Sequence, residues 1–417
     1  MNLFEEYHLS NPLMTAINQL GFDNPTQIQQ LSIPHIMAGK DVIGESATGS
    51  GKTLAFGCSV VDHAISGQGL QALILTPTRE LAEQVRMSLT QLSYFKHLRV
   101  ISVYGGVSIS NQINNLTKAE VVVATPGRLL DHIRRRTINT SKIKVLVLDE
   151  VDTMFDMGFI EDVKKIIRVC PTNRQTLCFS ATISSSIKEL ANKYMINPIR
   201  VSAVKLVDPS KMEQIYYNVR RNVKLSLLIH LLQHEQSKLV MVFCNTRRAT
   251  DIVVKNLRGN KINATAIHGG LSQNKRTSTL RMFNNAKANV LVCTDVASRG
   301  LHIDNVSHVY NYDLPKDAKD YVHRIGRTAR AGETGKVINL LCDIDHDNFS
   351  RILREYNSFR IEKVEPPVME KVLIISADND YGQQRSHNGW RGQQSHHRST
   401  NHWNGPPRRN SFGAQRR

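Results

Sequence analysis

The chain has 417 residues, more than one compact hydrophobic core normally supports, so its length predicts at least two domains. Its formal net charge of +18 and its pI near 9.7 favour a polyanionic partner, either nucleic acid or an anionic membrane surface. No apolar run approaches the roughly 20 residues that a membrane span needs, and the acidic N-terminal segment lacks the apolar stretch of a signal peptide. Six cysteines without CxxC spacing favour reduced thiols, so we expect a cytoplasmic protein that does not enter a membrane.

Short runs rich in Val, Ile and Leu recur along the chain, each followed by a polar or glycine-containing turn and a segment of helical periodicity. The first series is 41–44, 72–75, 100–103, 121–124, 145–148 and 176–179, and the second is 239–243, 263–267, 290–293, 308–310 and 336–341. Continuous apolar strands that alternate with helices are typical of parallel sheets covered on both faces. The sequence therefore predicts an α/β fold with two tandem doubly wound domains.

The two series are separated near residues 202–211, where periodicity is lost and Asp208, Pro209 and Ser210 occur. We expect the first domain at 1–203, a linker at 204–211 and the second domain at 212–377. Residues 378–417 are rich in Gln, Asn, His, Arg and Gly and hold almost no aliphatic side chains, which predicts a disordered basic tail. Its interleaved Arg and Trp residues suit a tether for single-stranded RNA, and a solubilising tail is the alternative.

The segment GESATGSGKT follows the expected strand at 41–44 and precedes a helical pattern. Backbone N–H groups of a glycine-rich loop at a helix N-terminus can surround the oxygens of a phosphate. Gly49 and Gly51 permit a close approach, and Lys52 supplies a mobile positive charge. The hydroxyl of Thr53 can bind Mg²⁺. Taken alone, the string could also be a chance glycine-rich turn.

Two carboxylates follow the expected strand at 145–148. Ligands of open α/β sheets bind at the carboxyl ends of the strands, which is where Asp149 and Glu150 stand. Asp149 would hold Mg²⁺ through water, and Glu150 would orient and deprotonate an attacking water. The alternative is a solvated acidic turn. The sixteen histidines show no paired ligand spacing, so no metal besides Mg²⁺ is expected.

The phosphate loop, the DEVD string and further motifs between Phe4 and Gly332 resemble those of the DEAD-box family, ATP-dependent RNA helicases of superfamily 2 with two RecA-like domains, here of bacterial type. GFDNPTQIQ resembles the Q motif, which implies that Phe22 stacks on adenine and that Gln29 hydrogen-bonds its edge. The loop residues that the resemblance assigns to ATP are Ser46, Ala47, Thr48, Gly49, Ser50, Gly51, Lys52 and Thr53. In the second domain it assigns Asp295, Arg327 and Arg330 to ATP.

The resemblance also implies RNA contacts in both domains. In the first domain they come from PTREL (77–81), GG (105–106) and TPGR (125–128). In the second they come from motif IV (VFCNT, 242–246), the QxxR element (273–276) and motif V (TDVASRGLHI, 294–303). The residues so assigned are Pro77, Thr78, Arg79, Gly105, Gly106, Thr125, Pro126, Gly127, Arg128, Thr246, Arg247, Gln273, Arg276 and Thr294. Residues expected to couple the domains are Asp152, Ser180, Thr182 and His323. The run Arg134–Arg136 is either a solvated basic helix end or a further RNA contact.

Catalysis would then need both domains, because Lys52, Asp149 and Glu150 lie in the first and the arginine fingers Arg327 and Arg330 in the second. ATP and RNA would each favour closure of the two domains. The implied activity is local strand separation of RNA, gripped through its backbone with little sequence specificity. We expect a monomer with ATP and Mg²⁺ that serves either ribosome-assembly or RNA-decay assemblies.

Two alternatives remain at this point. One is a DNA helicase with the same two-domain motor. The other is an RNA-binding scaffold or annealing protein whose ATPase has decayed. The departures from the family pattern favour the second alternative: Ser46, Ala47, Val151 and His302.

Overall fold

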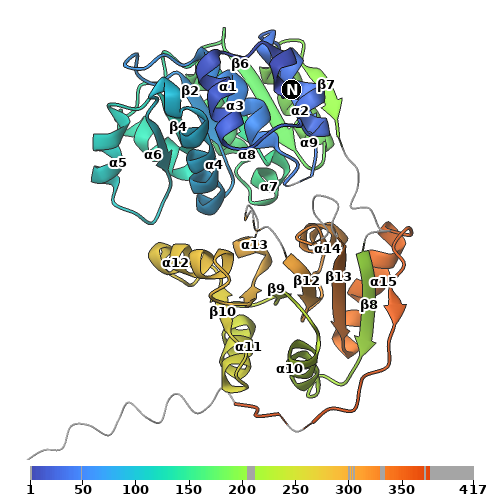
Figure 1. Cartoon of the computed structure of the whole chain (residues 1–417). Coiled ribbons are helices and arrows are strands. Elements are labelled where there is room, and N and C mark those ends of the chain that lie inside the picture. Colours follow the sequence, from blue (N-terminus) through green and yellow to red (C-terminus); the bar gives the residue numbers. More distant parts are fainter. Residues whose placement is uncertain are drawn as a thin grey trace, which may run out of the picture. The chain divides into compact units, whose positions relative to one another are not determined.

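The computed structural model describes residues 2–47, 49–203, 212–298, 301, 303, 306–328, 334–370 and 372–375 (Figure 1). These residues form two seven-stranded sheets flanked by helices, and each sheet pairs its strands in parallel. The expected linker at 204–211 and the expected tail at 378–417 lie outside the described residues. Thr48, His302 and Arg330 lie outside them as well.

In the first sheet the strand order is β3-β4-β2-β5-β6-β1-β7. The strands are β1 (Val42–Glu45), β2 (Ala72–Leu75), β3 (Val100–Val103), β4 (Val121–Ala124), β5 (Val145–Asp149), β6 (Gln175–Ser180) and β7 (Ile199–Ser202). Alternate side chains of each strand enter different core clusters, so Ala72 and Ile74 pack on one face of the sheet and Leu73 and Leu75 on the other. Both faces are therefore apolar, as the continuous apolar runs of the sequence predict.

Helices cover the two faces of the first sheet. The face that includes Ile74 is covered by η1 (Leu3–Tyr7), α1 (Asn11–Gln19), α2 (Gln27–Met37), α3 (Lys52–His63) and α4 (Arg79–Leu92), with η2 (Tyr94–Lys96) following α4. The opposite face is covered by α5 (Ile109–Leu116), α6 (Pro126–Arg134), α7 (Val151–Asp156), α8 (Ile160–Val169) and α9 (Ser185–Tyr194). Exposed Arg134–Arg136 end α6, and Arg135 pairs with Asp131.

The second sheet has the order β10-β11-β9-β12-β13-β8-β14. Its strands are β8 (Met212–Asn218), β9 (Leu239–Phe243), β10 (Ala264–Ile267), β11 (Val290–Cys293), β12 (Val306–Asn311), β13 (Gly335–Leu341) and β14 (Glu362–Lys363). One face packs on α10 (Lys224–His234) and α11 (Arg247–Gly259). The other packs on α12 (Gln273–Asn284), α13 (Asp295–Ser298), α14 (Ala318–Ile325) and α15 (His346–Glu355), with η4 (Asp343–Asp345) before α15.

All eleven expected apolar runs are strands, and the expected fold class is confirmed. The sequence did not predict β7, β8 or β14. These strands lie at or next to one edge of their sheet, where polar side chains face solvent and break the apolar run.

The strand order of the second sheet repeats that of the first, with β9, β10 and β11 in the places of β2, β3 and β4. Because every strand pair described is parallel, the carboxyl ends of the strands of a sheet lie along one edge, and the loops that follow them lie together.

Within the described residues, no helix has both the length and the apolar character needed to cross a membrane. The six cysteines all fall in the described part of the chain, where each is buried and none forms a disulfide.

Candidate active site

The glycine-rich loop leaves β1 at Glu45 and enters α3 at Lys52. Gly49 and Gly51 have φ values of 82° and 93°, which glycine adopts without steric cost. Gly51 is the N-cap of α3, so the first N–H groups of the helix point toward the loop. Lys52 is buried, and its Nζ donates to the carbonyl oxygen of Ser46 at 3.3 Å. The loop therefore presents a helix N-terminus and one cation to an anion.

Ser46 is one of the departures from the family pattern, and its side chain has a defined place. It is fully buried, its N–H donates to the Ser180 carbonyl at 2.9 Å, and its hydroxyl accepts from the Ser50 hydroxyl at 2.9 Å. The hydroxyl pair ties the two ends of the loop together. Ala47, in contrast, is exposed.

Asp149 and Glu150 stand at the carboxyl end of β5. Burial raises the pKa of Asp149 to about 7, against the opposing charge of Lys52 and with the help of the Glu150 carboxylate. Glu150 caps α7 with φ of 51° and ψ of 53°, a left-handed conformation that is strained for a residue with a side chain. Such strain is concentrated at functional sites.

Because the charges of Lys52 and Glu150 both act on the Asp149 carboxyl, these three side chains form one electrostatic cluster.

Three of the four expected coupling residues contact one another. The Asp152 N–H donates to the Ser180 hydroxyl at 3.2 Å, and Asp152 Oδ2 accepts from the N–H and hydroxyl of Thr182 at 3.0 and 3.1 Å. Burial opposes ionisation of Asp152, but the positive charges of Lys52 and His323 outweigh it and lower its pKa. Asp152 therefore links α7 to the loop after β6. His323, the fourth expected coupling residue, affects Asp152 through its charge, which lowers the pKa of the Asp152 carboxyl.

The expected Q motif lies against the phosphate loop. Gln29 Nε2 donates to the Gly51 carbonyl at 3.0 Å, and its Oε1 accepts from the Thr26 N–H at 2.8 Å. The Thr26 hydroxyl donates to the Ser50 carbonyl at 2.7 Å. Both ends of the Gln29 amide thus have protein partners, and its contact with adenine stays a prediction. Phe22 is 44% exposed, which leaves its ring accessible for stacking.

In the second domain, Asp295, one of the expected ATP residues, is held by a buried arginine that the sequence analysis missed. Arg324 is 1% exposed and pairs through Nε and Nη2 with both carboxylate oxygens of Asp295, at 2.6 and 2.7 Å. It also donates to Asn245 and Asn311. Arg327 is buried, and its Nη1 donates to the Leu301 carbonyl at 2.6 Å. The string HRIGR contains Arg324, so the signal was present.

Four of the expected RNA residues are threonines that stand between a strand and a helix. Thr78 and Thr246 cap α4 and α11, where their hydroxyls accept from Leu81 N–H at 3.3 Å and Ala249 N–H at 3.1 Å. Thr125 is the N-cap of α6, and Thr294 directly precedes α13. A helix N-terminus favours phosphate through its unpaired N–H groups and its dipole. Pro77 is buried before Thr78, Pro126 occupies the first turn of α6, and Gly127 is exposed.

The threonines and glycine pairs of the two domains lie at the same number of residues after corresponding strands. Thr78 lies three residues after β2 and Thr246 three after β9, while Thr125 and Thr294 directly follow β4 and β11. The pair Gly105–Gly106 begins two residues after β3, and the pair 269–270 begins two residues after β10.

An arginine lies over each glycine pair. A Cβ on Gly106 would lie 2.1 Å from Arg79 Nη1, and one on Gly269 would lie 3.1 Å from Arg247 Nη2. Gly269 and Gly270 were missed by the sequence analysis, and the repeated offset is the signal that identifies them.

Gln273 and Arg276 lie on the first turn of α12 and contact Glu80 of α4. Gln273 Nε2 donates to Glu80 Oε1 at 2.9 Å, and Arg276 pairs with Glu80 Oε2 at 3.0 Å. Arg79 Nη1 donates to Gln273 Oε1 at 3.4 Å. The structure thus brings the PTREL and QxxR elements together at Glu80, a residue that the expected site did not contain.

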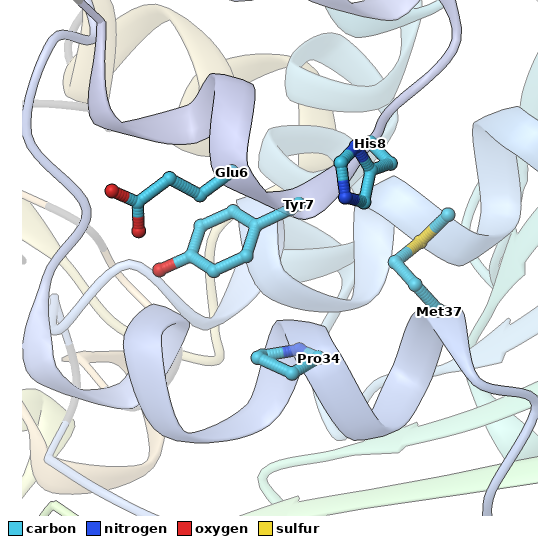
Figure 2. A pocket seen from close by; sticks show the side chains of 5 residues that line it. All are labelled: Glu6, Tyr7, His8, Pro34 and Met37. Carbon is cyan, nitrogen blue, oxygen red and sulfur yellow. The ribbon is translucent and has the colours of Figure 1, made fainter.

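A cavity of about 570 Å³ lies between η1 and α2. Figure 2 shows the Tyr7 ring above Pro34, with His8 and Met37 beside them and Glu6 also lining the space. None of these five residues belongs to the expected site, and we assign no function to the cavity.

The chain matches two family models. The DEAD/DEAH box helicase model matches residues 26–190, and the helicase conserved C-terminal domain model matches residues 223–332.

Similar proteins share most of their length with this chain. The ATP-dependent RNA helicase CshA of Listeria monocytogenes is 44% identical over 89% of this chain and 72% of its own. The DEAD-box ATP-dependent RNA helicase CshA of Bacillus subtilis is 41% identical over 89% of this chain and 75% of its own. The solved structure of S. cerevisiae Dbp5 bound to RNA and ADP BeF3 has a TM-score of 0.80 and 27% identity, and covers 88% of this chain and 96% of that one.

Proposed function

Because this chain belongs to the DEAD-box family of ATP-dependent RNA helicases, we propose that ATP binds at the loop between β1 and α3 and that Lys52, Asp149 and Glu150 act on its phosphates. The protein is an ATP-dependent RNA helicase with two RecA-like domains. The observation that carries the assignment of the site is the electrostatic cluster of Lys52, Asp149 and Glu150. It joins the loop after β1 to the acids after β5, as hydrolysis of a nucleoside triphosphate requires.

The loop residues fit the phosphates of ATP. The N–H groups at the start of α3 would cradle phosphate oxygens, with the close approach permitted by Gly49 and Gly51. Lys52 would exchange its hydrogen bond to the Ser46 carbonyl for one to a phosphate oxygen. The exposed ring of Phe22 supports stacking on adenine.

The same cluster fits Mg²⁺. Asp149 is buried beside Glu150 and Asp152, with Lys52 as the nearby cation, so a divalent ion would complete the charge balance. Carboxylate and hydroxyl oxygens are suitable ligands, and we assign them to Asp149 (through water) and Thr53. When bound, the ion would neutralise charge on the phosphates.

Glu150 is the group we assign to the attacking water. Its left-handed backbone directs the residue away from the regular course of β5 and α7, and the side chain is 5% exposed. From this position the carboxylate would orient the water and accept its proton. Arg327 and Arg330 of the second domain would stabilise charge on the γ-phosphoryl group, so hydrolysis would require domain closure.

We assign the RNA backbone to the helix N-termini at Thr78, Thr125, Thr246 and Thr294, together with Arg79, Arg128 and Arg247. Phosphate is the ligand that these positions suit, and backbone contacts carry little sequence information. RNA and ATP would each stabilise the closed arrangement, and their binding would be reciprocally coupled. The buried, reduced cysteines support a cytoplasmic location, where we expect a monomer in an RNA-decay or ribosome-assembly context.

Steady-state hydrolysis of ATP, measured without nucleic acid and with RNA or DNA of the same sequence, tests these assignments. We expect stimulation by RNA, weaker stimulation by DNA, and hydrolysis by Glu150→Gln that is slower by about 10²–10⁴. Unwinding of a short RNA duplex in the same samples should depend on ATP. Hydrolysis by Glu150→Gln at the wild-type rate would contradict the proposed active site, and equal stimulation by DNA would contradict the proposed RNA contacts.

A further inference from the structure

The guanidinium of Arg128 is held at one nitrogen by two contacts. Its Nη1 donates to the Val107 carbonyl at 3.1 Å and to Gln112 Oε1 at 3.0 Å. In the part of the chain that the structure describes, Nε and Nη2 of Arg128 have no hydrogen-bond partner, and the side chain is only partly buried. The planar group is thus fixed on one side and keeps donors for an oxyanion, a geometry that suits a phosphate.

Gln112 of α5 contributes the contact on Arg128, although no motif includes it. It is 6% exposed, and its Nε2 donates to the Tyr104 carbonyl at 3.0 Å. Its Oε1 accepts from both Arg128 and the ring of His132. An arginine can only donate, so the amide has one orientation that satisfies every partner.

His132 lies one turn after Arg128 on α6 and is completely buried. Its Nε2 lies 3.1 Å from Gln112 Oε1, and its Nδ1 lies 2.8 Å from the Thr137 hydroxyl. Burial and the nearby charge of Arg128 lower the pKa of His132, which favours the neutral ring. Because Gln112 Oε1 can only accept, the proton of that ring is on Nε2.

We propose that Gln112 and His132 are positioning residues that hold Arg128, which lies beside the glycine turn, in the geometry that binds an RNA phosphate. Tyr104 and Val107, whose carbonyls receive hydrogen bonds from Gln112 and Arg128, directly flank Gly105–Gly106. The cluster therefore joins two elements assigned to RNA, the turn after β3 and the first turn of α6. This proposal rests on the RNA role proposed above for Arg128.

The physical benefit is preorganisation. A long arginine side chain loses rotamer freedom when it binds a phosphate, and a side chain already held in place loses less. Gln112 and His132 would thus strengthen RNA binding without touching RNA, ATP or the reacting atoms. Their loss should raise the RNA concentration needed for activity and leave turnover at saturating RNA unchanged.

A double-mutant cycle on the full chain tests this proposal. The variants are Gln112→Met, which keeps the length of the side chain but removes its polar atoms, Arg128→Ala, and the two combined. Gln91→Met, at an exposed glutamine of α4, is the matched control. The readouts are the KM for single-stranded RNA in the ATPase reaction, kcat, affinity for a nucleotide analogue without RNA, and the melting temperature.

We expect Gln112→Met to raise the KM for RNA about 2- to 10-fold, the factor that immobilising one long side chain is worth, with kcat unchanged. The combined variant should match Arg128→Ala, because Gln112 acts through that arginine. His132→Phe keeps the contacts of Gln112 with Arg128 and Tyr104, so it should raise KM by a smaller factor. If Gln112→Met lowers the melting temperature strongly, His132→Phe replaces it in the double-mutant cycle with Arg128→Ala.

Independent, multiplicative effects of Gln112→Met and Arg128→Ala on KM would overturn the proposal. So would a loss of nucleotide affinity in parallel with that of RNA, which is the result expected of a purely structural role. An unchanged KM in Arg128→Ala would instead remove the RNA role of Arg128 itself. The single variants therefore separate a failure of positioning from a failure of the proposed RNA site.

Discussion

Gln29 and Gly51 are in direct contact: the side-chain Nε2 of Gln29 donates to the Gly51 carbonyl at 3.0 Å, and a Cβ on Gly51 would lie 2.4 Å from that nitrogen. Position 51 combines this proximity with φ of 93°, so a residue with a side chain would be strained there and would also displace Gln29. The residue expected to recognise adenine therefore also supports the backbone that would bind the phosphates. Changes at Gln29 should affect both ends of the nucleotide.

Replacing Gln29 with Glu should weaken the binding of ATP more than that of GTP. The carboxylate cannot donate to the Gly51 carbonyl, which would cost about 1–3 kcal/mol, and it also lacks a donor for adenine. Titration with fluorescent ATP and GTP analogues measures both effects. Gln27→Glu, at an exposed position two residues earlier, is the control. An unchanged ATP-to-GTP ratio would show that Gln29 does not recognise the base.

Lys52→Ala and Glu150→Gln should separate nucleotide binding from turnover. We assign Lys52 to the phosphates of bound ATP, so its removal should abolish detectable binding at ATP concentrations near the wild-type dissociation constant. We assign Glu150 to the attacking water, so Glu150→Gln should bind ATP normally and slow single-turnover hydrolysis by about 10²–10⁴. Lys40→Ala, an exposed lysine just before β1, controls for the loss of a charge. Equal losses of affinity in the two variants would invalidate these separate roles.

Arg327→Ala should reduce RNA-stimulated hydrolysis by about 10³ or more while leaving nucleotide affinity without RNA nearly unchanged. The reason is that Arg327 belongs to the second sheet and the phosphate loop to the first. Single-turnover kinetics with saturating RNA give the rate, and Arg354→Ala, at an exposed site on α15, is the control. Because Arg327 is buried and donates to Leu301, a melting curve must accompany the rates. Hydrolysis at the wild-type rate would exclude Arg327 as an arginine finger.

Arg79→Ala and Arg247→Ala should weaken RNA binding to similar extents. Each arginine directly follows a helix N-cap and covers a glycine pair, at equal offsets from corresponding strands. If each neutralises one phosphate, the slope of log affinity against log salt should fall by about 0.7 in each variant. The exposed neighbour Arg248 supplies the control variant, Arg248→Ala. A salt slope that changes in only one of the two variants would mean that the repeated geometry does not have a repeated function.

Truncation after Ala377 should weaken RNA binding and flatten its salt dependence. The removed segment holds seven Arg and two Asp, a net charge of +5. If all seven Arg contact phosphates, at about 0.7 per contact with a single strand, the slope should fall by at most about 5. The cut spares a docked segment: Asn260 exchanges hydrogen bonds with the backbone of Leu373, and Asn256 does so with Ile375. Affinity for ATP should change little. If RNA affinity and slope are unaffected, residues 378–417 are a solubilising tail.

The fold class could be predicted because buried parallel strands are continuous apolar runs, and the loops after them contain glycines, acids and threonines that such runs exclude. The same regularity explains why edge strands were missed. Glu362–Lys363 pairs with β8 through backbone hydrogen bonds, and neither side chain is buried. Backbone pairing leaves no pattern in the residue types when no side chain enters the core.

Functional residues were found where a contiguous string assigns their role, such as Lys52 in the phosphate loop or Asp149 in DEVD. They were missed where their role depends on a distant partner. Glu80, Gln112, Gly269 and Arg324 all belong to this second group. Each contacts a motif residue that is distant in sequence, and only the packing of helices and loops brings the two together.

The sequence by itself determined which chemistry this protein can perform, because a phosphate loop, two carboxylates and a pair of arginines must be encoded as residue types in a fixed order. Only the tertiary structure decided how those groups are held. Gln29 on the phosphate loop and Arg324 on Asp295 are separated from their partners by 22 and 29 positions. Such pairs form because helices that cover a parallel sheet, here α2 and α14, lie beside the loops at the carboxyl ends of its strands. Hydrogen bonds across those ends leave no local pattern in the chain, so geometry had to reveal them.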